Sequence, residues 1–141
     1  MPLEARLSDK SLLDPRFRQI LELALVDVCN LSVPSMSGFK FEIYETYRTP
    51  ERHAAMYRSG LEKCKYNFLG DRCAVKLKLY NRTEHRWSDN EEDRGMVWAY
   101  NMLISLLRGK YGFLSGKDLR DEDTGKRLYD HGLFYVARSQ E

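Results

Sequence analysis

Residues 45–60 read ETYRTPERHAAMYRSG, and within this stretch the sequence changes from one regular pattern to another. The preceding residues 39–44 alternate apolar and polar side chains, which is typical of a half-buried strand. The Thr49 hydroxyl can accept hydrogen bonds from free helical N–H groups, and Pro50 suits the first helical position. Gly60 fits a left-handed C-terminal cap. The stretch therefore predicts a strand that turns into a short helix ending at Gly60.

Upstream of this stretch, apolar residues recur at offsets of 3, 4, 7, 8 and 11 from Phe17, which is the spacing of one helix face. Asp14 and Pro15 form a favourable helix start, because aspartate caps free N–H groups and proline fits the first turn. We expect this helix to end near residues 29–30.

Downstream, residues 73–80 alternate again and predict a second strand. The acidic run at 88–93 favours the start of a third helix, whose apolar stripe extends from Met96 to Leu107. We expect Gly109 to end that helix and residues 133–137 to form a last strand. Residues 31–38, 62–72 and 115–127 have the composition of loops.

Helices and strands thus alternate along the chain, but the loops are irregular and the sequence has no glycine-rich phosphate loop. We therefore predict an α+β fold, with a single small antiparallel sheet and helices packed on one side, as one domain over residues 1–141.

Composition excludes several classes of protein. The chain has 23 Lys and Arg against 21 Asp and Glu, a formal net charge of +2, which is too small to favour nucleic acid as a partner. With 31% charged residues and no long apolar run, it does not resemble a membrane protein. The N-terminus lacks a secretory pattern, and the three cysteines show no metal-type pairing. We expect synthesis in the cytosol and reduced thiols.

The block at residues 45–60 resembles the GYRT/S-xER-x-x-LY-x-x-G pattern of the zinc D-alanyl-D-alanine carboxypeptidases. That family includes the VanY-type enzymes and the L-alanyl-D-glutamate endopeptidases of phage endolysins. Weaker similarity covers residues 12–18, the strand at 72–77 and the closing segment at 130–135, in the same order over about 120 residues. The resemblance implies the peptidase fold of that family and a bacteriophage origin, with synthesis in the bacterial cytoplasm and a place in the virion as one option.

The same resemblance implies that all three zinc ligands are missing. The family binds zinc through a histidine, an aspartate and a second histidine, and these positions fall at Leu69, Lys76 and Leu133 of this chain. None of the three offers a lone pair, and a lysine ammonium repels a metal cation. Asp130 stands at the position of the catalytic carboxylate and is a relict of it. The resemblance therefore predicts no cofactor, and apolar side chains that fill the former metal space.

Two site interpretations stay open at this point. Arg48, with Tyr47 beside it, is a candidate for binding the carboxylate of a ligand, and the alternative for Arg48 is an ion pair with Glu45, Glu51 or a nearby aspartate. A displaced zinc site built from Cys73, His85 and His131 is conceivable, although its spacing matches no known metal pattern. We otherwise interpret His53 as an exposed residue of the short helix.

These observations favour a pseudoenzyme on the peptidase scaffold, acting as a virion structural or assembly part or as a module that binds cell-wall peptides. Its partners would be a protein of a phage particle or a peptidoglycan peptide. The alternative is an active zinc-dependent peptidase of peptidoglycan stem peptides with displaced ligands, with Asp130 as general base and Arg48 on the substrate.

Overall fold

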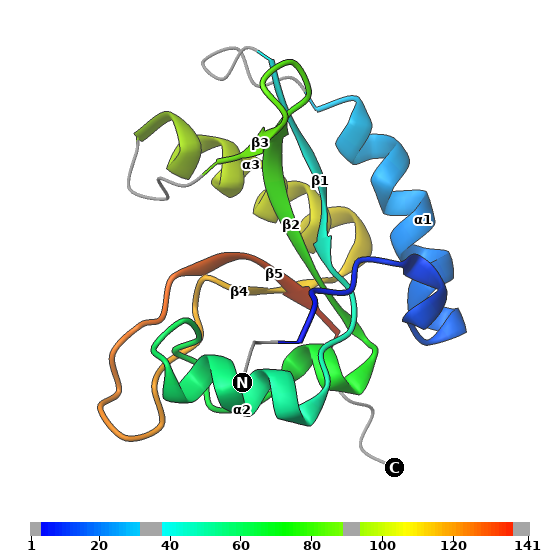
Figure 1. Ribbon diagram of the computed structural model, residues 1–141. Helices are drawn as coiled ribbons and strands as arrows, with labels where there is room; N and C mark the ends of the chain where they lie inside the picture. Colours follow the sequence, from blue (N-terminus) through cyan, green and yellow to red (C-terminus); the bar gives the residue numbers. More distant parts are fainter. Residues whose placement is uncertain (1–3, 32–37, 89–93, 137–141) are drawn as a thin grey trace.

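The structure is a computed structural model that describes residues 4–31, 38–88 and 94–136 (Figure 1). Most of the acidic run predicted to start the third helix, residues 89–93, lies outside the described residues, as does the last residue of the predicted final strand.

One antiparallel sheet forms the centre of the fold. Its strands are β1 (Phe39–Glu45), β2 (Ala74–Asn81), β3 (Arg86–Trp87), β4 (Leu114–Gly116) and β5 (Asp130–Tyr135). The order across the sheet is β1-β2-β5-β4, and β3 pairs with the far end of β2. The predicted α+β class with a small antiparallel sheet is confirmed. The two shortest strands, β3 and β4, were not predicted, because two or three residues show no period.

Three helices join the strands: α1 (Pro15–Cys29), α2 (Pro50–Arg58) and α3 (Arg94–Tyr111). The Asp14 carboxylate caps α1 by accepting from the backbone N–H groups of Arg16 and Phe17, and the Thr49 hydroxyl caps α2. Short 3-10 turns occur at Lys10–Leu12 (η1) and Phe68–Asp71 (η2). No helix in the described parts of the chain combines the length and apolar composition that a bilayer crossing requires.

The predicted end of the third helix was wrong. Gly109 lies inside α3, and the helix continues to Tyr111. Gly112, with a φ of +73°, follows as the left-handed residue that closes it. A glycine within a helix destabilises it by only about 1 kcal/mol, and burial of the neighbouring Leu107 offsets that loss.

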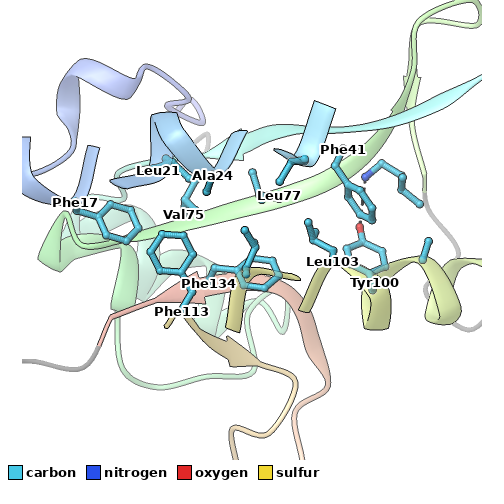
Figure 2. Packing of buried hydrophobic residues seen from close by; sticks show 14 of the residues in the cluster. Phe17, Leu21, Ala24, Phe41, Val75, Leu77, Tyr100, Leu103, Phe113 and Phe134 are labelled. Atoms are coloured by element: carbon cyan, nitrogen blue, oxygen red, sulfur yellow. Dashed lines mark hydrogen bonds between the residues drawn. The ribbon is translucent and has the colours of Figure 1, made fainter. Parts of the chain in front are cut away.

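The main core lies between α1, α3 and one face of the sheet. Val75, Leu77 and Leu79 of β2 point to this face and are fully buried. Figure 2 shows side chains of α1, β2 and α3 meeting there, with the Phe17 and Phe113 rings 5.5 Å apart. The alternation of β2 therefore puts Ala74, Lys76, Lys78 and Tyr80 on the opposite face.

That opposite face carries a second, smaller cluster of buried apolar side chains, formed by Leu69, Ala74 and Leu133. Phe68, Leu119 and Tyr135 pack around it. This is the face on which the residues that resemble the peptidase site meet.

Candidate functional site

The strand register places three chemically different residues in one row across the sheet. Lys76 of β2 pairs with Glu45 of β1 on one side and with Leu133 of β5 on the other. Directly paired residues of antiparallel strands point to the same face, so these three side chains lie together. Leu69 of η2 packs onto Leu133 from outside the sheet.

A very small cavity remains at this place. It has a volume of about 10 Å³ and is lined by Arg48, Leu69, Lys76, Asp130 and Leu133 among others. That volume is about the least that holds one water molecule. The three positions that the resemblance assigns to zinc ligands and the position of the catalytic carboxylate therefore converge on one point, and side chains fill most of it.

Arg48 is held by a dense set of charged hydrogen bonds. The side chain is 1% exposed, and its Nε and Nη2 donate to both oxygens of Glu45, at 3.2 and 2.6 Å. Its Nη1 donates to Oε1 of Glu62 at 2.7 Å. Arg52 of α2 also donates to Glu45, at 3.0 Å. The ion pair with Glu45, which the sequence offered as the alternative role of Arg48, is therefore present. Its two hydrogen bonds form the bidentate geometry that a guanidinium favours.

The pKa shifts in this network follow from burial and from the paired charges. Burial disfavours the Glu45 carboxylate, but Arg48 and Arg52 outweigh that effect and lower its pKa. For Glu62 burial again opposes the charge, and Lys76 and Arg48 more than offset it, so that its pKa is also lowered. Both carboxylates are therefore charged at neutral pH.

His53 of α2 was interpreted as exposed, and this interpretation was wrong. The residue is only 6% exposed. Its Nε2 lies 3.0 Å from the carbonyl oxygens of both Cys64 and Lys65, which can only accept, so Nε2 carries the proton. Its Nδ1 is then an acceptor for Nη1 of Arg48, at 3.2 Å. His53 thus ties the loop after α2 to the Arg48 network.

Lys76 and Asp130 form an ion pair in which Nζ lies 3.4 Å from Oδ2, with both side chains about one-seventh exposed, at 14% and 15%. Burial disfavours the ammonium, yet Asp130 and Glu62 outweigh it and raise the pKa of Lys76. Lys76 is therefore charged at neutral pH at this point of the sheet.

These residues do not fit a zinc ion of the family's kind. Two of the ligand positions, Leu69 and Leu133, have no donor atom, and the third presents a charged ammonium toward Asp130. The described residues contain no cluster of three or more His, Cys, Asp or Glu side chains with metal-binding geometry.

The other residues singled out from the sequence lie elsewhere. Tyr47 does not line the cavity, and its ring lies 4.2 Å under the guanidinium of Arg72. Cys73 and His85 lie beyond opposite ends of β2, and His131 packs beside the rings of Tyr100 and Tyr129. The structure does not bring Cys73, His85 and His131 together.

Sequence reasoning missed Glu62 and His53 as members of the site. Glu62 is in a loop without periodicity, and nothing in its local sequence distinguishes it from a solvent-exposed glutamate. His53 is the fourth residue of α2, and its burial depends on which face of the helix it occupies. The nearness of Glu45 and His53 to Arg48 in the sequence, three residues before it and five after it, was the available signal, and it can be interpreted only when the turn at residues 46–49 is known.

Comparison with solved structures connects this arrangement to a known fold. The chain resembles the crystal structure of Serratia marcescens L-Ala D-Glu endopeptidase ChiX, with a TM-score of 0.57 and 14% sequence identity. The match covers 95% of this chain and 91% of that one. It shows that the chain has a peptidase-like α+β fold. No protein-family model matches the sequence, and no curated protein does either.

Proposed function

We propose that this chain is a pseudoenzyme: a protein with a peptidase-like fold that binds a partner and does not hydrolyse peptides. The observation that carries the proposal is the Lys76–Asp130 ion pair at the centre of the former site. In a zinc peptidase of the kind that residues 45–60 resemble, this point would hold a metal ion and the carboxylate that acts on water.

For each part of zinc-dependent hydrolysis, this chain has a residue that opposes it. The Lys76 ammonium repels a cation, and Leu69 and Leu133 replace donors with apolar carbon. The carboxylate of Asp130 is paired with Lys76, and Arg48 is paired with Glu45 and Glu62. The cavity that these side chains enclose has a volume of about 10 Å³, which holds about one water molecule.

A scaffold that keeps its fold without this chemistry serves by binding. The resemblance at residues 45–60 suggests two partners, a protein of a bacteriophage particle and a peptide of peptidoglycan. The first would make the chain a structural or assembly part of a virion, and the second would make it a cell-wall-binding module. In both roles the buried charge network around Arg48 is structural, because it holds α2 and the following loop onto the sheet.

The test is zinc content together with a designed restoration of the ligands. Untagged protein is purified without chelator and its zinc is measured by elemental analysis, beside a variant carrying Leu69→His, Lys76→Asp and Leu133→His. We expect less than one-tenth of a zinc ion per native chain, and zinc uptake by the variant. About one zinc ion per native chain would overturn the proposal.

The second measurement is cleavage of peptidoglycan stem peptides by the native chain at added zinc, followed by mass spectrometry. We expect no cleavage. Cleavage that disappears in Asp130→Asn would overturn the proposal in favour of an active peptidase with displaced ligands.

A further inference from the structure

Two hollows lie beside the filled centre and share part of their lining. The first has a volume of about 200 Å³ and lies over Lys76, Lys78 and Asp130. The second has a volume of about 610 Å³ and lies over Val97, Lys117, Arg127 and His131. Lys63, Leu128 and Tyr129 line both, so the hollows adjoin there, and together they are called the groove. This groove is far larger than the cavity at the former catalytic centre.

The groove has an excess of uncompensated positive charge. Its two carboxylates, Glu62 and Asp130, are neutralised by Arg48 and Lys76. The remaining cations are Lys63, Lys78, Lys117 and Arg127, and none of them has a carboxylate partner among the described residues. Four such charges in one groove account for more than the formal net charge of +2 of the whole chain.

Carboxylates of the described residues gather in a neighbouring hollow. The segment between β4 and β5 that supplies Arg127 also carries Asp121, Glu122 and Asp123. Those three residues line a third hollow of about 90 Å³, together with Lys65 and Arg120, and this hollow adjoins the groove at Cys64 and Leu128. Among the described residues of the groove itself the carboxylates are paired and four cations are not, so charge complementarity favours an anionic occupant.

Apolar surface accompanies the cations. Leu61 and Leu128 line the first hollow, and Val97 and Leu128 line the second. Tyr129, where the hollows meet, is 54% exposed and held at a φ of +52°, with its ring stacked on His131 at 6.2 Å. A non-glycine residue seldom adopts that backbone conformation. An exposed aromatic ring on a braced backbone is a typical anchor for a partner's side chain.

We propose that this groove binds an acidic segment of a partner protein, in which aspartate or glutamate residues alternate with aliphatic ones. The inference rests on the proposed function, since it names the partner's chemistry for the non-catalytic scaffold. A single exposed aromatic ring in the groove and the small net charge disfavour single-stranded nucleic acid, which needs rows of stacking rings and a larger basic excess.

The test is fluorescence anisotropy with a labelled twelve-residue peptide of alternating glutamate and leucine. The groove variant carries Lys63→Glu and Arg127→Glu. The matched control carries Lys10→Glu and Lys126→Glu, which change the net charge equally at exposed sites outside the groove. We expect the groove variant to bind at least ten-fold more weakly and the control to bind within three-fold of the native chain. Equal weakening in both variants, or no binding by the native chain, would overturn the proposal.

Two competitors identify the class of ligand. A twelve-nucleotide oligothymidine or a peptidoglycan stem peptide that binds more tightly than the acidic peptide would also overturn the proposal. Zinc content and stem-peptide cleavage are measured on the same preparation. Zinc binding or cleavage means that the proposed function has failed. If the chain is metal-free and inactive but does not bind the acidic peptide, only the groove assignment has failed.

Discussion

The ammonium of Lys76 and the carboxylate of Asp130 face each other across strands β2 and β5, with Nζ 3.4 Å from Oδ2. Directly beside them Leu133 pairs with Lys76 in the strand register, and Leu69 packs onto Leu133. An ion pair beside leucine side chains thus stands at the positions that the sequence resemblance assigns to the metal ligands and the catalytic carboxylate. The pair has consequences for stability that can be measured.

Substituting one partner of the pair alone should destabilise the protein more than substituting both partners together. Lys76→Met leaves Asp130 without its cation, and Asp130→Leu leaves Lys76 facing only Glu62, so each should lower the free energy of unfolding by about 3 kcal/mol. The double variant should lose clearly less than the sum, because it buries no unpaired charge. Urea denaturation of the four proteins gives the coupling energy. Strict additivity would mean that the two groups do not interact.

Arg48 should matter far more for stability than a surface arginine with a similar partner. Arg48→Met leaves Glu45, which is fully buried, with Arg52 alone, and should lower the free energy of unfolding by about 3–5 kcal/mol. Arg82 pairs with Glu42 but is 67% exposed, and Arg82→Met should cost less than about 1 kcal/mol. Thermal and urea unfolding compare the two. Similar small losses would show that the buried network is not needed for the fold.

Acid should destabilise the protein through Glu45 and Glu62. Their pKa values in the folded chain lie below the ordinary value of 4.5, so the unfolded chain binds protons first as pH falls. Their contribution to stability is therefore complete above about pH 4.5 and is lost as pH falls through the folded pKa values. We expect a nearly constant melting temperature between pH 7 and 5 and a steep drop below pH 4.5. Glu62→Gln should melt lower at pH 7 and show a shallower acid drop, whereas an unchanged drop would assign the effect to other groups.

Two glycines should respond oppositely to alanine. A Cβ at Gly132 would lie 2.3 Å from the backbone oxygen of Leu77, so Gly132→Ala must displace β2 or β5 and should lower the free energy of unfolding by about 2 kcal/mol or more. Gly109 lies within α3 with open space around it, so Gly109→Ala should stabilise by about 0.5–1 kcal/mol. Denaturation curves of both variants decide this. A stable Gly132→Ala protein would contradict the close strand approach.

Much of the fold could be predicted from the sequence because the signals are local. Asp14 and Thr49 start their helices through bonds to residues two or three positions on, and the alternation in β1 and β2 needs no distant partner. The end of α3 could not be predicted, because burial of Leu107 by the core carries the helix past Gly109. Strands β3 and β4 are too short to show a period, and only pairing with longer neighbours makes them strands.

The candidate site also combines features that the sequence determines with features that only the tertiary structure decides. The amino-acid sequence by itself determined which chemistry is available, since Leu69, Lys76 and Leu133 offer no metal donors in any conformation. Only the tertiary structure decided that these residues meet at one point, that Glu62 and His53 join Arg48, and that four cations line one groove. The physical reason is that side-chain chemistry is a property of each residue, whereas burial and charge pairing arise from strand register and loop packing between residues far apart in the chain.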